Sequence, residues 1–165
     1  MIIPKKMFLT KGMGIHKDKL FSFELALREA GIEKFNLVSV SSIVPPKCQL
    51  VSKEEGLKFL KPGQILFCVL AKTQTNIPNL PITSAIGIAL PKEEGYGYVY
   101  EYHCSGKRVK HPGVYAQRLA AEMLATAKGK KGLLEEFTTF SIYQSAKGNK
   151  DGLWTTVISV AGFIV

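Results

Sequence analysis

Asn36-Leu-Val-Ser-Val-Ser41-Ser42-Ile-Val-Pro45-Pro46 predicts a short strand over Asn36–Val40 that is then forced to bend. The two prolines cannot continue a regular strand, because each lacks a backbone donor and fixes its own φ. A serine pair therefore stands where the backbone turns, and strain at such a place can push a serine hydroxyl toward the preceding carbonyl carbon. On these residues alone, an ordinary polar loop is the more common explanation.

The segments on either side of this stretch predict two main helices and several strands. Apolar residues three and four apart predict an amphipathic helix over Lys19–Ala30, with Asp18 as its cap and Gly31 as its end. A second helix, Pro112–Lys128, has proline in its first turn and closes at Gly129. The other predicted elements are a short helix, Lys53–Leu60, and the strands Ile65–Ala71, Thr83–Leu90, Gly97–Cys104, Glu136–Gln144 and Leu153–Val165.

This order of elements predicts the fold class. Strands that follow one another, with two main helices between them, indicate an α+β protein whose antiparallel sheet is covered by helices on one face. The segment Thr73–Pro81 carries two prolines and two asparagines, so it is expected to be an irregular loop.

Length and composition limit the kind of protein. The 165 residues are expected to form a single domain over 1–165, with 46% apolar and 21% charged residues as in ordinary globular chains. The apolar runs are too short to cross a membrane, and the lysine-interrupted N-terminus does not resemble a signal peptide. Three cysteines without a metal-type spacing favour a reducing compartment. We therefore expect a cytoplasmic protein without a membrane partner.

The net charge of +9 leaves a basic nucleic-acid-binding module as an alternative. The basic residues form two tight clusters, Lys107-Arg108-Val-Lys110 and Lys128-Gly-Lys130-Lys131, both beside glycines. No aromatic residues alternate with them to stack on bases. The charge is therefore expected to be a solvated surface, with no nucleic acid as partner.

Two further patterns give weak signals. His103, Cys104 and His111 are close in sequence, but adjacent strand residues point to opposite faces, so no metal site is expected. The pair Gly12-Met-Gly14 lacks both a third glycine and an expected preceding strand, so it does not indicate a nucleotide-binding loop.

A family resemblance favours a functional role for the serine pair over an ordinary polar loop. The segment Glu24–Pro46 combines a helix, Ala-Gly-Ile, Asn-Leu and Ser-Ser-Ile-Val-Pro-Pro, and in this order it resembles the pyruvoyl-dependent arginine decarboxylases. Thr83-Ser-Ala-Ile-Gly-Ile-Ala-Leu-Pro-Lys92 and Tyr98-Val-Tyr-Glu101-Tyr are similar to the same family at compatible spacing. Each motif is weak by itself, and together they are specific. The likeness extends from about residue 20 to 104 and weakly to the C-terminus.

The resemblance implies a self-processing lyase with a four-layer αββα sandwich and mainly antiparallel sheets. The Ser42 hydroxyl would attack the Ser41 carbonyl, and elimination from the resulting ester would divide the chain into residues 1–41 (β chain) and 42–165 (α chain). Ser42 would become a covalent pyruvoyl group. Side chains offer no electrophilic carbonyl, so this cofactor would supply the electron sink for decarboxylating L-arginine to agmatine.

The resemblance also implies roles for four other residues and an assembly. Glu101 would be the proton donor, and aromatic and apolar neighbours on its strand are expected to favour its protonated form. Asn36 would polarise a carbonyl during processing. Six residues of straight strand span roughly 20 Å, so either the strand bends or Asn36 serves a neighbouring protomer of a trimer, and we expect the second. On sequence alone, an ordinary asparagine at the start of a strand is an equal alternative. Glu24 and Ile43 would bind substrate.

Glu24 departs from the family pattern, which usually has aspartate at this position. Glutamate is one methylene longer, so preference for another cationic amino acid is an open alternative to arginine. The other interpretation of Glu24 is a surface residue that pairs with Arg28 at i+4.

Overall fold

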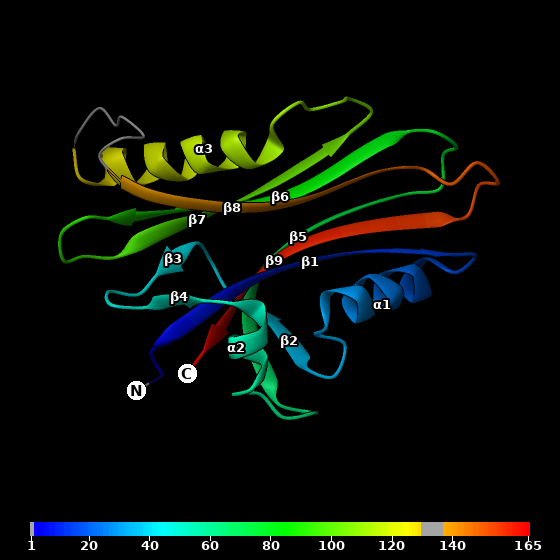
Figure 1. Ribbon diagram of the computed structural model, residues 1–165. Helices are drawn as coiled ribbons and strands as arrows, with labels where there is room; N and C mark the ends of the chain where they lie inside the picture. The colour runs from blue at the N-terminus through cyan, green and yellow to red at the C-terminus, as the bar shows by residue number, and fades with distance from the viewer. Residues whose placement is uncertain (1, 130–136) are drawn as a thin grey trace.

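The computed structural model describes residues 2–129 and 137–165, which form two β-sheets and three helices (Figure 1). The helices are α1 (Lys19–Ala30), α2 (Lys53–Leu57) and α3 (Pro112–Ala127). The strands are β1 (Lys6–His16), β2 (Asn36–Ser39), β3 (Ile43–Val44), β4 (Gln49–Val51), β5 (Ile65–Thr75), β6 (Pro81–Pro91), β7 (Gly97–Ser105), β8 (Phe137–Lys147) and β9 (Trp154–Ile164).

The strands form two sheets of different size. Sheet A has the order β2-β5-β9-β1-β4, and sheet B has the order β3-β7-β6-β8. The long strands pair antiparallel, whereas the short strands β2 and β4 at the edges of sheet A pair parallel to β5 and β1. The expected mainly antiparallel arrangement is confirmed.

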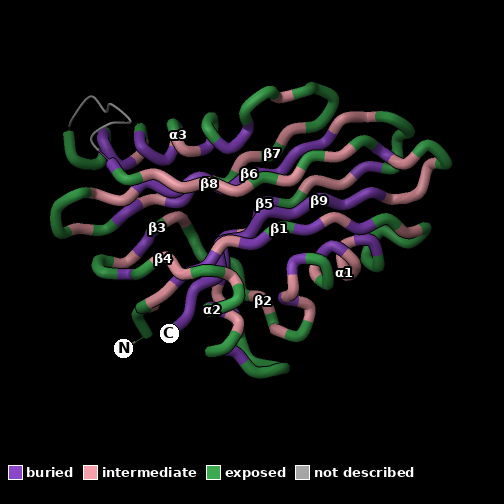
Figure 2. The backbone as a smooth tube through the Cα atoms, viewed as in Figure 1, coloured by how far each residue is buried: buried purple, intermediate pink, exposed green. Residues whose placement is uncertain are grey.

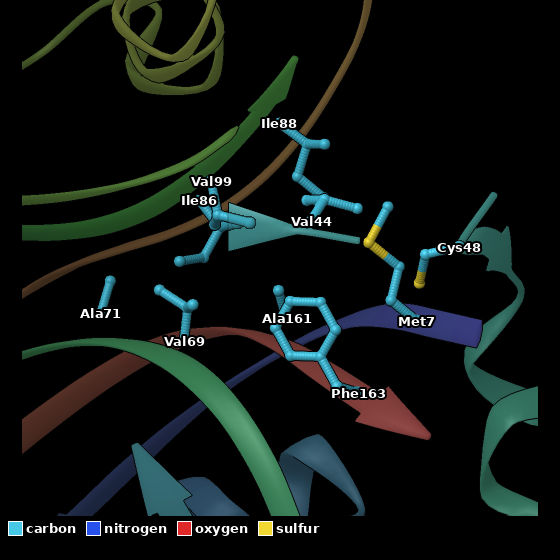
Figure 3. Packing of buried hydrophobic residues seen from close by; sticks show 10 residues of the cluster. All are labelled: Met7, Val44, Cys48, Val69, Ala71, Ile86, Ile88, Val99, Ala161 and Phe163. Atoms are coloured by element: carbon cyan, nitrogen blue, oxygen red, sulfur yellow. The ribbon is translucent and has the colours of Figure 1, made fainter. Parts of the chain in front are cut away.

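The two sheets pack face to face around a shared apolar core (Figure 3). Val69 and Phe163 from sheet A meet Ile86 and Val99 from sheet B, and all four side chains are buried. Figure 2 shows that the central strands are buried along most of their length, while the edges and connections are exposed.

Helices cover the outer face of each sheet. α1 packs on sheet A through Ala26 and Ala30, and α3 packs on sheet B through Ala120 and Leu124 (Figure 1). The result is the expected four-layer αββα sandwich of the α+β class. None of the described helices is long and apolar enough to cross a membrane.

The helix boundaries follow the local signals closely. Asp18 accepts a hydrogen bond from the N–H of Phe21 and so caps α1, and Gly31 ends the helix with a left-handed φ of 77°. The predicted helix Lys53–Leu60 is shorter than expected and ends at Leu57.

Two predictions about strands need correction. The expected irregular loop Thr73–Pro81 is mostly strand at its start, because β5 continues to Thr75 before the chain turns into β6. The predicted strand Glu136–Gln144 runs on to Lys147, and its expected first residue lies outside the described residues.

The strand β1 was not predicted, and its glycines explain why α1 packs so closely. A Cβ atom at Gly12 would lie 2.0 Å from the carbonyl oxygen of Ala26, and one at Gly14 would lie 2.1 Å from that of Ser22. The pair Gly12-Met-Gly14 therefore lies within a strand under a helix, where only glycine leaves room for the helix backbone.

Candidate active site

The chain between β2 and β3 crosses from sheet A to sheet B. The N–H of Val40 donates to the carbonyl oxygen of Cys68 on β5 at 2.9 Å, so pairing with sheet A continues one residue beyond β2. Two residues later, the carbonyl oxygen of Ser42 accepts from the N–H of Val99 on β7 at 2.7 Å. The Ser41–Ser42 linkage therefore spans the two sheets and is held on both sides by backbone hydrogen bonds.

The proline turn returns the chain to sheet A after this crossing. The N–H of Cys48 donates to the carbonyl oxygen of Pro45 at 3.2 Å, and Lys47 has a left-handed φ of 64°. This turn leads from β3 in sheet B into β4 in sheet A. The expected bend at the serine pair is confirmed, but neither serine has the positive φ that would indicate local backbone strain.

A shallow apolar depression of about 240 Å³ lies beside the serine pair. Ser41 and Ile43 line it together with Val40 and Phe67. Ser41 and Ile43 are exposed and Ser42 is half-buried, so solvent and small molecules can reach the linkage. Ile43, an expected substrate contact, is therefore placed beside the cleavage position.

Glu101 lies on β7, two residues from the strand position that holds Ser42. It shares the inner face of the strand with the buried Val99, as the alternation of side chains predicts. Its side chain is 47% exposed, so the expected enclosure by apolar and aromatic groups is wrong for a single chain. The nearby tyrosines belong to the opposite face, where Tyr98 and Tyr100 pack against the α3 core.

Cys68 lies on β5, opposite Ser39 of β2, and the pKa of its thiol is affected by the charge of Glu101. Burial raises the pKa of the Cys68 thiol to about 11, and the negative charge of Glu101 adds to this shift. The Glu101 carboxylate therefore influences the Cys68 thiol on β5, the strand that pairs with β2.

His103 is a neighbour of Glu101 that we did not predict as a site residue. Its Nε2 lies 3.5 Å from Oε1 of Glu101, and its Nδ1 lies 3.1 Å from the carbonyl oxygen of Lys72 on β5. The period-two spacing from Glu101 could have placed both side chains on one face. The contact with β5 could not have been predicted, because it joins strands of different sheets.

Asn36 lies at the far end of β2 from the serine pair. Its side-chain Nδ2 donates to the carbonyl oxygen of Gly63 at 2.8 Å, and the side chain is exposed. The structure therefore does not bring Asn36 and Ser42 of the same chain together.

Glu24 is also separate from the serine pair in a single chain. It lines a depression of about 410 Å³ on α1 with Leu20 and Phe21, whereas the serine pair borders a different depression. Its Oε1 accepts from Nε of Arg28 at 3.0 Å, so the i,i+4 pair considered for this residue is present. The carboxylate is 37% exposed and remains accessible to a cationic ligand.

The other candidate clusters lie away from the crossing. No group of three His, Cys, Asp or Glu side chains within residues 2–129 and 137–165 is placed to hold a metal ion. Lys107, Arg108 and Lys110 line a depression of about 440 Å³ with Lys147, next to the far end of β7. The second basic cluster continues into residues outside the described ones.

Fold and site together define an αββα sandwich protein whose candidate catalytic centre lies where the chain crosses between the sheets, beside a carboxyl group. A model of the family "Pyruvoyl-dependent arginine decarboxylase (PvlArgDC)" matches residues 6–165. The chain belongs to this family, and it is accordingly a decarboxylase that uses a covalent pyruvoyl cofactor.

Curated relatives match the chain over nearly its whole length. The chain is 52% identical to pyruvoyl-dependent arginine decarboxylase 2 of Methanosarcina mazei, with 99% of this chain and 98% of the relative covered. It is 49% identical to pyruvoyl-dependent arginine decarboxylase of Methanococcoides burtonii, covering 99% and 100%. It is 50% identical to the probable pyruvoyl-dependent arginine decarboxylase of Chloroherpeton thalassium, covering 96% of each.

Proposed function

We propose that this protein converts L-arginine to agmatine and CO2, and that its pyruvoyl group is made from Ser42 by self-cleavage after Ser41. The observation that carries the proposal is the Ser41–Ser42 linkage, which spans two sheets with the Ser42 carbonyl bound to the N–H of Val99. When present, the pyruvoyl group supplies the electron sink for loss of the carboxylate.

The hydrogen bonds around the linkage fit a pyruvoyl group at position 42. The carbonyl that Val99 binds belongs to residue 42 itself, so it stays with residue 42 when the preceding bond breaks. Pairing of Ile43 with Tyr98 holds the next residue on β7. A new amino terminus at residue 42 would thus remain anchored to sheet B beside Glu101.

The sheet topology supports a cleaved chain that stays together. Residues 1–41 would supply β1 and β2, and residues 42–165 would supply the strands that flank them. β1 pairs with β9 over eleven residues, and β2 pairs with β5. The β chain would therefore remain an integral part of sheet A, and the single domain over 1–165 would persist as two interleaved fragments.

We assign the proton transfer to Glu101. Decarboxylation leaves a carbon that must take up a proton, and the donor has to lie close to the reacting carbon. Glu101 shares a strand face with Val99, the residue that holds position 42, and this supports the assignment.

We assign Asn36 and Glu24 to a site completed by a second protomer. Neither side chain meets Ser42 of its own chain, yet both are accessible at the surface. Exposed apolar side chains lie on the same elements and beside the serine pair, and such patches mark surfaces that associate. Val38 on β2 and Ile65 on β5 lie near Asn36, Leu20 and Phe21 lie on α1 with Glu24, and Val40 and Ile43 flank the serine pair.

The assembly we propose is a homotrimer of processed protomers in the cytoplasm. Three free cysteines fit a reducing compartment. Within the trimer, the Glu24 carboxylate would bind the substrate guanidinium through a charge-assisted pair. Glu24 pairs with Arg28 and is one methylene longer than the aspartate usual in the family. Decarboxylation of another cationic amino acid is therefore the second candidate function.

Denaturing mass spectrometry tests the processing. The purified protein should give two fragments divided between Ser41 and Ser42, and borohydride should react with the new terminus of the larger one. Ser42→Ala should give one intact chain without activity, whereas Ser39→Ala, a change at an exposed position of β2, should still cleave. A whole, unreactive wild-type chain would refute the proposal and favour the basic binding module.

Assays with arginine, lysine and ornithine then test the substrate. Release of agmatine and CO2 from arginine, well above release from the other two amino acids, is the expected result. A preference for lysine or ornithine in a fully cleaved enzyme would contradict arginine as the substrate while leaving the cleavage mechanism intact.

A further inference from the structure

His103 bridges the two sheets next to the proposed proton donor. Its ring lies between the carbonyl oxygen of Lys72 on β5, 3.1 Å from Nδ1, and the carboxylate of Glu101 on β7, 3.5 Å from Nε2. Its backbone partner on the neighbouring strand β6 is the uncharged Ser84. The ring therefore has one fixed contact and one contact with a titratable group.

The contact with Lys72 determines which ring nitrogen carries the proton. A carbonyl oxygen only accepts hydrogen bonds, so Nδ1 of His103 must donate. In the neutral ring, the lone pair is then on Nε2, which faces Glu101. A protonated Glu101 can donate to this lone pair, and an imidazolium ring can donate from Nε2 to the carboxylate.

The reaction needs such an exchange in every turnover. Loss of CO2 from arginine leaves a carbon that takes up one proton, and a donor that gives this proton must regain one from solvent. Nε2 of His103 faces the Glu101 carboxyl, and the two side chains are 44% and 47% exposed, so water can supply a proton to the pair.

We infer that His103 is a positioning and proton-relay residue for Glu101, with its ring fixed through Nδ1 to the carbonyl oxygen of Lys72 and its Nε2 holding the carboxyl that serves the reaction. This inference rests on the proposed role of Glu101. Solvent returns the proton to the exposed Glu101–His103 pair, where Oε1 and Nε2 share it, and the carboxyl passes it to the substrate carbon, so that the ring ends each cycle unchanged.

The charged and titratable groups around the ring are few among the described residues. Glu101 is the only one within ion-pair distance. The ammonium of Lys72 is directed elsewhere, 4.4 Å from the centroid of the Phe23 ring. Cys68 on β5 feels the charge of Glu101, but its thiol is buried and its raised pKa of about 11 keeps it neutral.

His16 provides an internal comparison for the tautomer. The backbone N–H of Asp18 donates to Nδ1 of His16 at 3.0 Å, so Nδ1 of His16 carries no proton and its neutral ring is protonated on Nε2. His103 and His16 are thus expected to be opposite tautomers in one protein.

Ring ¹⁵N NMR of the histidine-labelled protein tests the inference without measuring activity. In the full-length Ser42→Ala chain and in the processed protein, His103 should be protonated on Nδ1 and His16 on Nε2. Glu101→Gln should shift the Nε2 resonance of His103 and leave both His16 signals unchanged. A His103 ring protonated on Nε2, or one insensitive to Glu101→Gln, would overturn the inference.

Kinetics supply the second readout. His103→Ala should cleave fully, keep KM for arginine within about twofold, and lose about tenfold or more in kcat. Because the ring is half-exposed, added imidazole should restore part of the lost rate. His111→Asn, at the start of α3, is the matched control and should behave as wild type.

The outcomes separate this inference from the proposed function. A wild-type protein that does not decarboxylate arginine refutes the function, whatever the tautomers show. An active wild type whose His103→Ala variant keeps its kcat, loses it only through KM, or cannot be restored by imidazole refutes the relay alone.

Discussion

Glu101 combines solvent exposure with a position beside the residue that holds Ser42, so its charge can be removed without disturbing a core. We predict that Glu101→Gln cleaves as wild type but loses about a hundredfold or more in kcat, because the amide cannot donate an acidic proton. Mass spectrometry checks cleavage, and CO2 release from carboxyl-labelled arginine checks turnover. Glu122→Gln on the exposed face of α3 is the control. Normal CO2 release by Glu101→Gln would remove Glu101 from the mechanism.

Glu24 allows a test of substrate recognition at a second single residue. Glu24→Gln keeps the shape of the side chain but removes the charge that a guanidinium would pair with. We predict a rise of about tenfold or more in KM for arginine with complete cleavage, since a hydrogen bond to a charged group contributes roughly 1.5–3 kcal/mol. Glu54→Gln on α2 is the control, and an equal KM for both variants would contradict the assignment.

The elements show how far local patterns carry a prediction. α1 was predicted with its observed bounds, Lys19–Ala30, because an amphipathic period, a cap at Asp18 and a stop at Gly31 all act within a few residues. β1 was missed because a strand buried under a helix loses the alternation that marks exposed strands, and its glycines are typical of loops.

Prediction of the site was likewise limited to signals that lie within a few residues of one another. The serine pair and Glu101 were found from nearby sequence and resemblance. The hydrogen bond from Val99 to Ser42 and the contact of His103 with Lys72 join segments that only the packed sheets bring together. No period or motif within either segment encodes such a contact.

The close approach of α1 to β1 predicts a large effect for a small change. Gly12→Ala should destabilise the protein by about 3 kcal/mol or more, because its Cβ would meet the backbone of Ala26 rather than a side chain that can move. Gly63→Ala is the matched control. It has open space and a φ of 82°, so only backbone strain of about 1–2 kcal/mol is expected. Urea unfolding at fixed protein concentration measures both, and equal losses would contradict the packing argument.

The packing of the strands also predicts which thiols react. Burial raises the pKa of Cys48 and of Cys68 to about 11, so at pH 8 both thiols are protonated and shielded. Cys104 on β7 is only partly buried. A thiol reagent at pH 8 should therefore modify Cys104 alone in the folded protein and all three cysteines in denaturant. Cys104→Ser is the control, and rapid reaction of that folded variant would refute the assignment.

At the scale of the whole molecule, the structure separates groups that the proposed chemistry needs together. The carbonyl of Ser42 is bound to Val99, two residues from Glu101, at the sheet crossing, whereas Asn36 binds the carbonyl of Gly63 at the other end of β2. Exposed Val38 on β2 and Ile65, the β5 partner of Asn36, lie near it, and exposed Val40 lies near the serine pair, which gives a protomer surface that association would cover. A site shared between protomers reconciles these positions.

Mixing two inactive variants tests this shared site. Asn36→Ala keeps a functional Ser42, and Ser42→Ala keeps a functional Asn36, so a trimer containing both can form a complete site between unlike neighbours. Random assembly of equal amounts makes about a quarter of all sites complete, and co-expression should restore about that fraction of wild-type activity. If Asn36 served the Ser42 of its own chain, no mixed trimer could hold a complete site, and the co-expressed variants would stay as inactive as each is alone.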